Sequence, residues 1–311
     1  MNKKKKTIKK IIPNHIHIET INGFCTARCP MCTWALWTRK PNIMNNSTYV
    51  KILEKFKPYC KHIHYLSLHS CGEPLLDKEL VEKIKIAKKM GFKGIGFATN
   101  CTELNKHKAK EIILSGLDTI FLGIDGTTKA VHEAIRVGTD FDKVILNVKR
   151  FIELRNELGK TKIVIRFIRQ ESNKHQWSEF LNYWTNLLNS DLGDEIVKFD
   201  IHNWGGDLVN YESKDANKDI TPENNICQDV FKRMVVFSDG EVSLCCADYN
   251  GFFHIGNVLE EDPIEIYNNE IFDHYRKTML EGNILDLEHC KTCTIIRSRG
   301  LRNEESLSMD I

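Results

Sequence analysis

FCTARCPMCT, residues 24–33, places Cys25, Cys29 and Cys32 close together along the chain. Spacings of four and three would align the three thiols on one face of a helix. Pro30 disfavours a helix, because it lacks an amide hydrogen and pushes the residue before it out of the α conformation. The segment is therefore predicted to be a loop that turns its thiols toward a common centre.

The composition is that of an ordinary globular chain, with 311 residues and a formal net charge of +2 at pH 7. A net charge so close to zero gives no indication of a nucleic-acid or membrane partner. No apolar run reaches the roughly 18 residues of a membrane span. The basic opening MNKKKKTIKK is not followed by the apolar segment of a secretory signal. Residues 1–14 are expected to form a solvated tail, and the protein is expected in the cytoplasm.

Cysteine is abundant for a chain in a reducing compartment, with 11 residues in all. An odd number without a secretory signal does not predict a disulfide framework. Most of the cysteines lie in two groups, the loop at residues 24–33 and a second group near the other end of the chain. The second group contains Cys227, Cys245, Cys246, Cys290 and Cys293. Clustered thiols of this kind indicate metal binding.

Strand-like and helix-like segments alternate through residues 15–205. Such alternation predicts a parallel sheet, and six units of this kind predict an α/β fold, a partial (βα)6 TIM-like barrel. The expected strands are 15–21, 62–69, 93–100, 117–125, 161–169 and 194–204. Chemistry is then expected at their carboxyl ends, where several polar segments fall. These are the cysteine loop, CGEP at 71–74, TN at 99–100, DG at 125–126 and HNWGGD at 202–207.

The pattern changes after the last expected strand. Residues 206–225 are polar and are predicted to be a linker, and residues 226–295 are predicted to be a small cysteine-bearing domain. Within it, MVVFSDGEVSLCC predicts a β-hairpin turning at Gly240, and a helix is expected over 263–281. Residues 296–311 are expected to be a charged tail.

Taken together and in their order, these segments resemble the radical S-adenosylmethionine (SAM) enzymes. The residues that carry the resemblance are Cys25-Thr-Ala-Arg-Cys29-Pro-Met-Cys32, Gly72-Glu73-Pro74, Thr99-Asn100 and Asp125-Gly126. The resemblance implies that Cys25, Cys29 and Cys32 hold a 4Fe-4S cluster with one open iron. In such enzymes SAM binds that iron, and its reductive cleavage gives a 5′-deoxyadenosyl radical that abstracts hydrogen.

The same resemblance assigns SAM contacts. Gly72 and Glu73 would bind its amino group. Asn100 and Asp125 would lie along its ribose and methionine, and Pro74 and Thr99 are also expected in the cofactor site. A carboxylate suits an ammonium group, and glycine lets the backbone come close.

Three further features of the barrel sequence bear on these contacts. Arg136 is expected either to pair with the SAM carboxylate or to form a salt bridge on a surface helix. Two positions differ from the usual family pattern, with Met31 in place of an aromatic residue and Gly123 in place of a serine.

The second cysteine group resembles twitch, the shortened form of the SPASM auxiliary-cluster domain. Gly240 precedes Cys245 by the spacing of that family. Hairpin alternation points Cys245 and Cys246 to opposite faces, and Cys245 is expected to be the ligand. Cys227, Cys245, Cys290 and Cys293 would then hold an auxiliary 4Fe-4S cluster, with a structural zinc site as the alternative.

Several other residues near the barrel mouth are candidates for the reaction itself. His202, Trp204 and Asp207 follow the sixth strand and are candidate substrate contacts, although ordinary packing explains them equally well. Cys71, next to the SAM-binding loop, is a candidate hydrogen-atom donor, with a buried inert thiol as the alternative.

The resemblance and the second cysteine group together lead to a functional hypothesis. We expect oxidation of a secondary alcohol of a sugar or aminocyclitol, with the auxiliary cluster accepting the electron from the substrate radical. The alternatives are modification of a ribosomally made peptide, an epimerase, or a metal-cluster sensor or scaffold without turnover. A small-molecule substrate and a low-potential donor such as flavodoxin or ferredoxin are the expected partners.

Overall fold

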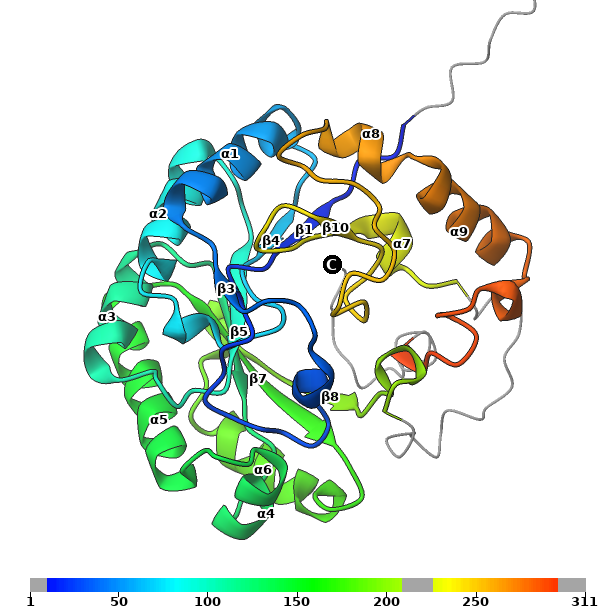
Figure 1. Cartoon of the computed structure of the whole chain (residues 1–311). Helices are drawn as coiled ribbons and strands as arrows, with labels where there is room; N and C mark the ends of the chain where they lie inside the picture. The colour runs from blue at the N-terminus through cyan, green and yellow to red at the C-terminus, as the bar shows by residue number, and fades with distance from the viewer. Residues whose placement is uncertain (1–9, 209–225, 296–311) are drawn as a thin grey trace, which may run out of the picture.

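The molecule is built on an eight-stranded sheet (Figure 1). The computed structural model describes residues 10–208 and 226–295. The strand order is β10-β9-β1-β4-β5-β6-β7-β8, and all neighbours from β9 to β8 are parallel. The six strands expected from the sequence are β1 (His15–Ile18), β4 (Tyr65–Ser67), β5 (Ile95–Thr99), β6 (Thr119–Gly123), β7 (Lys162–Arg169) and β8 (Glu195–Asp200). The predicted partial barrel is confirmed.

The C-terminal hairpin is part of this sheet. β9 (Arg233–Val236) runs parallel to β1, with His15 opposite Arg233, and β10 (Val242–Ser243) returns antiparallel to β9. The sequence predicts the hairpin but not its docking on the barrel. Without β9, the buried strand β1 would expose an unpaired edge. The two cysteine-bearing regions therefore share one hydrogen-bonded sheet.

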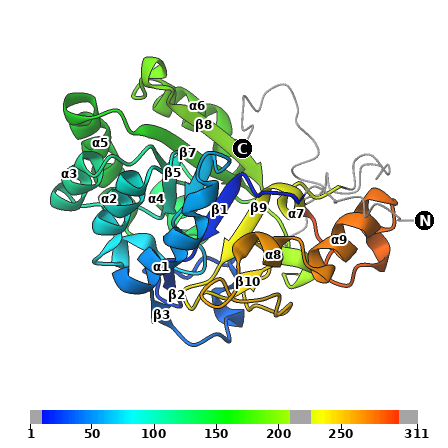
Figure 2. The same cartoon turned by 90° about the horizontal axis from the view of Figure 1, so that it is seen from above.

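Helices cover the outer face of the sheet (Figure 2). They are α1 (Asn46–Phe56), α2 (Leu80–Met90), α3 (Lys106–Leu114), α5 (Phe141–Leu158) and α6 (Trp177–Thr185). Asn45, Asn105 and Asp140 cap three of them by accepting a backbone N–H in the first turn. Gly91 ends α2 in the left-handed conformation, with φ 95°.

Some elements were not predicted, or were predicted differently. The short helix α4 (Lys129–Ile135) was missed. The helix expected over 263–281 is wrong as one element, because it is divided into α8 (Pro263–Tyr267) and α9 (Glu270–Leu280). Asn269 caps α9 by accepting from two backbone amides, which starts a new helix there. The helix α7 (Asp229–Lys232) precedes β9.

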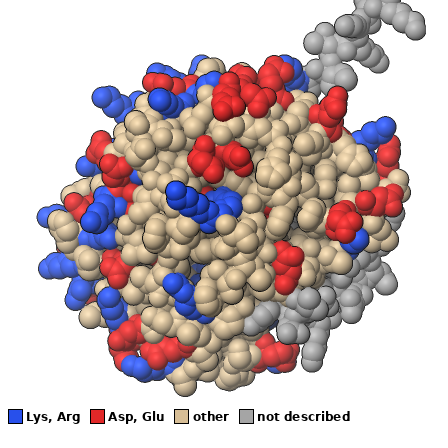
Figure 3. Space-filling model, viewed as in Figure 1, with Lys and Arg blue, Asp and Glu red and all other residues tan. Residues whose placement is uncertain are grey.

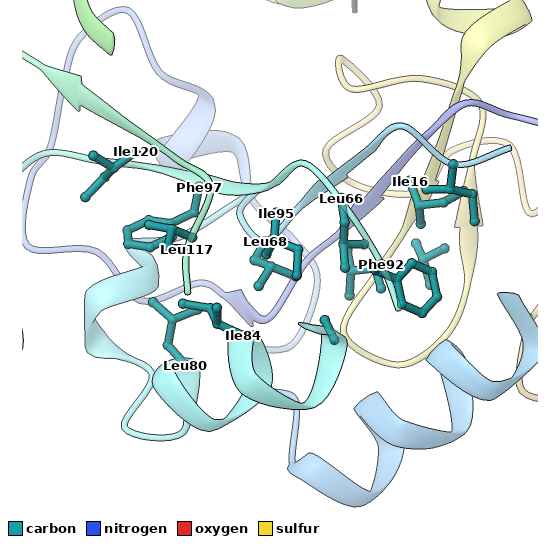
Figure 4. Packing of buried hydrophobic residues seen from close by; sticks show 14 of the residues in the cluster. Ile16, Leu66, Leu68, Leu80, Ile84, Phe92, Ile95, Phe97, Leu117 and Ile120 are labelled. Carbon is teal, nitrogen blue, oxygen red and sulfur yellow. The ribbon is translucent and has the colours of Figure 1, made fainter. Parts of the chain in front are cut away.

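The core lies between the sheet and its helices (Figure 4). Alternate strand residues such as Phe97 and Leu68 lie over α2, from which Leu80 and Ile84 project, and Ile16 lies farther along the same core near Phe92. The intervening strand residues point into the barrel. The outward face of each strand thus contributes to the hydrophobic core, and the inward face is available for a binding or active site.

Charges of both signs are scattered over the face seen in Figure 3, and basic side chains also lie near its middle. No helix in the described ranges, 10–208 and 226–295, is long and apolar enough to cross a membrane.

Candidate functional site

A small hairpin closes the base of the cysteine loop. β2 (Ile21–Asn22) pairs antiparallel with β3 (Asn42–Ile43), so the loop between them starts and ends at one place. Cys32 N–H donates to Cys29 O at 2.9 Å, and the 3-10 helix η1 (Thr33–Leu36) follows. The predicted loop is confirmed, and its hairpin base was not predicted.

The three thiols of the loop lie within electrostatic reach of one another. Burial raises the pKa of Cys32, and the neighbouring thiols of Cys29 and Cys25 raise it further. Burial raises the pKa of Cys25 and Cys29 as well. Thiols of this kind are protonated at neutral pH and lose their protons when they bind metal.

The loop also packs on apolar side chains of its surroundings. Cys29 and Met31 form a buried cluster with Ala27, Ile135 and Ile201. Met31 fills the place where many relatives have an aromatic residue, and it is buried. These contacts bury Cys29, whereas Cys25 and Cys32 remain partly exposed.

Two backbone hydrogen bonds join the cysteine loop to the loop that follows β4. Gly23 N–H donates to Cys71 O, and Glu73 N–H donates to Phe24 O, each at 2.8 Å. A Cβ atom at Gly72 would lie 2.8 Å from the carbonyl oxygen of Ile21. Only glycine allows so close an approach of the two backbones.

The Glu73 carboxylate is buried and fixed beside this junction. It accepts hydrogen bonds from Leu75 N–H (3.1 Å), Thr99 Oγ1 (2.6 Å) and Asn100 N–H (2.9 Å). Burial raises the pKa of Glu73, and these bonds act in the opposite direction. Pro74 starts the 3-10 helix η3 (Pro74–Leu76), which turns the chain away after the carboxylate. A rigid buried carboxylate of this kind suits an ammonium group.

Asn100 ties the end of β5 to the cysteine loop. Its Nδ2 donates to Thr26 Oγ1 at 2.9 Å and lies 3.6 Å from Cys25 Sγ. The structure thus brings Asn100 next to Cys25, the first cysteine of the loop. The sequence predicts this proximity, because both residues follow the carboxyl ends of parallel strands.

Asp125 and Arg136 form a buried pair on the other side of the loop. The Asp125 carboxylate accepts from Arg136 Nε and from Ile168 N–H, both at 2.6 Å. Arg136 Nη1 lies 4.0 Å from Cys29 Sγ. The expected surface-helix salt bridge is wrong, because the partner of Arg136 is a fully buried aspartate.

Gly123 makes room for this arginine. A Cβ atom there would lie 2.9 Å from Arg136 Nη2. The departure from the family's usual serine therefore has a local steric reason.

The second cysteine group lines one cavity. Cys227, Cys245, Cys246, Cys290 and Cys293 all contribute to its wall. Cys245 is within electrostatic reach of the other four thiols, which together with burial raise the pKa of Cys245 well above its usual value. Cys246 Sγ instead lies 3.2 Å from a carboxylate oxygen of Asp229.

The geometry of these thiols bears on the zinc alternative. Zinc requires its four ligands to converge on one ion. Across residues 10–208 and 226–295, no three His, Cys, Asp or Glu side chains converge in that way. The same is true of the three cysteines at residues 25–32, so this geometry does not distinguish zinc from a multi-iron cluster.

Trp204 connects the two cysteine regions. Its Nε1–H donates to Met31 O at 2.9 Å, while the same residue lines the second cavity. Asp207 accepts from the Tyr249 hydroxyl at 2.6 Å, and His202 lies against Trp204 with ring centroids 4.7 Å apart. Trp204 and Asp207, two of the three candidate substrate residues, thus also join the end of the barrel to the cysteine loop and to the C-terminal domain.

Cys71 is buried near the same junction. Its Sγ lies 3.7 Å from Tyr249 O, and burial raises its pKa well above the usual value. Sequence reasoning missed its neighbour Glu19, a buried carboxylate paired with Arg39. Burial raises the pKa of Glu19 from 4.5 to about 7. The inward alternation of His15, His17 and Glu19 was the available signal.

Comparison with known families agrees with this geometry. Residues 20–177 match the radical SAM superfamily, and residues 227–294 match the SPASM iron–sulfur cluster-binding domain. The chain belongs to the radical SAM superfamily and carries an auxiliary cluster domain. Members of this class bind SAM and a 4Fe-4S cluster, and the second domain binds further iron–sulfur.

Individual relatives cover most of the chain. A "Tungsten-containing aldehyde ferredoxin oxidoreductase cofactor-modifying protein" from Pyrococcus furiosus is 28% identical, over 91% of this chain and 90% of its own. BtrN, solved with AdoMet and 2-DOIA, has a TM-score of 0.62 at 19% identity and covers 91% and 94% of the two chains. Streptococcus suis SuiB, solved with precursor peptide SuiA, has a TM-score of 0.69 at 14% identity and covers 92% and 71%.

Proposed function

We propose that this radical SAM enzyme oxidises a secondary alcohol of a sugar-type or aminocyclitol-type small molecule to a ketone. The bound cofactors supply a 5′-deoxyadenosyl radical, which takes the carbinol hydrogen atom, and an auxiliary cluster, which takes the remaining electron as the hydroxyl proton leaves. Cys25, Cys29 and Cys32 would hold the SAM-binding cluster. Cys227, Cys245, Cys290 and Cys293 would hold the auxiliary 4Fe-4S cluster.

The observation that carries this proposal is the connection between the two thiol regions. Trp204 donates from its indole to Met31 O in the cysteine loop, and the same residue lines the second cavity. An electron leaving a substrate in the barrel would thus have an acceptor within the same molecule. The barrel's resemblance to BtrN in fold is consistent with this role.

The chain's own residues would fix SAM at the barrel mouth. Glu73, held by three hydrogen bonds, would receive the SAM ammonium group. Thr99, Asn100 and Asp125 would line its remaining length. Arg136 stays paired with Asp125 and next to Cys29, so it would orient this aspartate.

A second candidate function comes from the Pyrococcus furiosus relative, which matches over 91% of this chain and 90% of its own. That protein is named for modifying the cofactor of a tungsten-containing oxidoreductase. A cofactor precursor is also a small molecule, and the same radical chemistry would act on it. Peptide modification is a third candidate, because SuiB was solved with its precursor peptide.

The test is product analysis with the reconstituted enzyme, SAM and a chemical or flavodoxin reductant. Oxidation of a polyol predicts one ketone for each 5′-deoxyadenosine formed. Recovery of 5′-deoxyadenosine without an oxidised product, across a panel of polyols, would remove the dehydrogenase proposal. Consumption of SAM only in the presence of the metal-free cofactor of a tungsten-containing oxidoreductase would establish the second candidate.

A further inference from the structure

The turn that follows β8 is joined to the segment around Cys293 by buried hydrogen bonds. Asn203 Nδ2 donates to Thr292 O at 2.7 Å, and Asn203 Oδ1 accepts from Thr294 N–H at 3.0 Å. Asn203 N–H donates in turn to Thr294 Oγ1 at 2.9 Å. Asn203 and Thr294 are only 1% and 2% exposed, so water does not compete for these bonds. We call these contacts of Asn203 with Thr292 and Thr294 the clasp.

The clasp holds Trp204 in an unfavourable backbone conformation. Trp204 has φ 50°, and Gly205 and Gly206 follow with φ 78° and 111°. A bulky residue rarely adopts a positive φ, and it does so only where the surrounding structure imposes it. Thr292 Oγ1 donates to Gly205 O at 3.0 Å, and a Cβ atom at Gly206 would lie 2.4 Å from that hydroxyl oxygen. The two glycines therefore let the turn lie directly against the segment around Cys293.

The side chain of Trp204 extends this restraint to the cysteine loop. Its Nε1–H donates to Met31 O at 2.9 Å, and this oxygen belongs to the peptide that joins Met31 to Cys32. Cys32 N–H, in the same peptide, donates to Cys29 O at 2.9 Å. Trp204 thus helps to fix the peptide from which the Cys32 side chain extends.

These contacts form a continuous path between the two proposed metal sites. The path runs from Cys293 through its neighbour Thr294 to Asn203. From there it continues through Trp204 to the peptide before Cys32. A bound metal restrains its ligand residues and the chain beside them, and groups that touch ligand residues orient them. Metal in the second cavity should therefore hold the clasp, Trp204 and Cys32 in one arrangement.

We propose that Asn203 and Trp204 are positioning residues through which metal in the second cavity strengthens SAM binding at the cysteine loop. A shift of Cys32 would move the cluster that it is proposed to hold relative to Glu73, the proposed contact of the SAM ammonium group. The inference goes beyond the proposed function, because it holds whatever substrate the barrel accepts. By linkage, SAM must in return stabilise the clasp.

The first test is SAM binding to the oxidised holoenzyme, measured anaerobically by equilibrium dialysis without reductant or substrate. The comparison is with Cys245→Ala/Cys246→Ala, which removes whichever thiol of this pair is the auxiliary ligand, at equal iron content of the first cluster. We expect the dissociation constant for SAM to rise about fivefold in that variant, the effect of one net hydrogen bond. Equal affinities would overturn the inference.

Variants then locate the path. Trp204→Phe removes the bond to Met31 O, and Thr294→Val removes the hydroxyl from the clasp. Each should weaken SAM binding by a similar factor while both metals remain bound. The double variant should bind no more weakly than either one, because both changes break the same path. Thr294→Ser keeps the hydroxyl and should keep the affinity. Unchanged affinity in Trp204→Phe, or effects of the two variants that add, would contradict the path.

Two controls match these changes. Trp37→Phe also removes an indole hydrogen bond, the one to Thr33 Oγ1. Thr161→Val removes a buried hydroxyl that donates to Leu117 O, where β6 and β7 begin. Neither residue lies on the path, so both variants should keep the SAM affinity within about twofold. A fivefold loss in both controls would show that the effect is not specific to the path and would overturn the inference.

Hydrogen exchange distinguishes positioning from a general loss of stability. SAM should slow exchange of the amides at residues 290–295, which include Thr294 N–H, by about fivefold in the unmodified protein. In Trp204→Phe, SAM should leave the exchange of that segment unchanged, because the segment is no longer connected to the cysteine loop. Protection by SAM that persists in Trp204→Phe would exclude the indole as the connection.

The inference and the proposed alcohol oxidation fail separately, because no substrate enters these measurements. If SAM affinity depends on the second cavity but no ketone forms, the dehydrogenase proposal fails and the path remains. If a ketone forms and SAM affinity is independent of the second cavity, the path fails and the dehydrogenase proposal remains.

Discussion

The cysteine loop and the C-terminal cavity gather thiols in different ways. In the loop, three cysteines are close in sequence, and groups from other strands, Glu73 and Asn100, end beside them. In the cavity, the thiols come from distant segments and line the wall together. Three ligands leave one corner of a four-iron cluster for a substrate or cofactor, whereas four close it. The polar groups Glu73 and Asn100 beside the cysteine loop agree with an open corner there. The larger number of thiols around the C-terminal cavity agrees with a fully ligated cluster.

The largest effect should separate the two regions outright. In the variant Cys25→Ala/Cys29→Ala/Cys32→Ala, formation of 5′-deoxyadenosine should fall to background, because the open iron is lost. Iron analysis after anaerobic reconstitution should show about eight atoms per chain falling to about four. If iron falls to none while zinc is found in both proteins, the auxiliary 4Fe-4S proposal is wrong.

A matched pair of variants sharpens the second region. Cys245→Ala should lose the auxiliary cluster, about half of the iron, because the other four thiols of the group all lie within electrostatic reach of Cys245. Cys246→Ala should keep that iron, because Cys246 already contacts Asp229. The iron content and the low-temperature EPR spectrum of the reduced protein would be measured for both variants. If Cys246→Ala loses the cluster and Cys245→Ala keeps it, Cys246 is the ligand and Cys245 is not.

Glu19 lies where the two regions meet, and its pKa predicts a pH effect. The folded protein holds a proton on Glu19 up to about pH 7, whereas the unfolded chain releases it near 4.5. The free energy of unfolding should therefore fall as pH rises from 4.5 to 7, by about 3 kcal/mol. Glu19→Gln should remove that contribution in denaturant titrations at several pH values.

The surface substitution Glu265→Gln provides the control for Glu19, because its side chain is exposed. An identical pH dependence of unfolding in Glu19→Gln and in the unmodified protein would show that Glu19 has an ordinary pKa.

Glu73→Gln should weaken SAM without touching either cluster. The amide removes the negative charge and presents a donor to groups that now donate to the carboxylate. We expect the dissociation constant for SAM to rise by about tenfold, with unchanged iron content. Asp77→Asn offers a buried acid outside the site for comparison, since Asp77 pairs with Lys83. Equal SAM affinity in Glu73→Gln and the parent would refute the ammonium contact.

The smallest effect concerns the connection between the regions. Trp204→Phe removes the hydrogen bond to Met31 O but keeps an aromatic ring. One such bond contributes about 1 kcal/mol, so the melting temperature should fall by a few degrees with both clusters retained. Trp37→Phe is a control, because its indole donates only within its own loop, to Thr33. A loss of the auxiliary cluster in Trp204→Phe would assign the indole a larger role.

Much of this arrangement could be predicted from the sequence because it is local. The spacing of Cys25, Cys29 and Cys32, with Pro30 between, indicates a loop, and regular alternation gives six strands. The carboxyl ends of parallel strands then bring Glu73 and Asn100 to that loop without further information.

What could not be predicted depends on partners far away in the chain. The docking of β9 on β1 depends on an edge that no local pattern marks. The pair of Glu19 with Arg39 and the space that Gly123 leaves for Arg136 appear only once the barrel is closed. The identity of the substrate belongs to the same class of questions, because it depends on inward side chains that several strands contribute together.

The pairing of β1 with β9 also sets an order of assembly. His15 and Arg233, which meet across these strands, are 218 residues apart in the chain. On the ribosome, β1 emerges early and can pair with β4 on one side, while its other edge waits until β9 has been made. Of the cysteines in the second cavity, all but Cys227 are made after β9, so that cavity forms last. An enzyme interrupted before that point would carry a finished cysteine loop and an open sheet edge, the form that chaperones and proteases recognise.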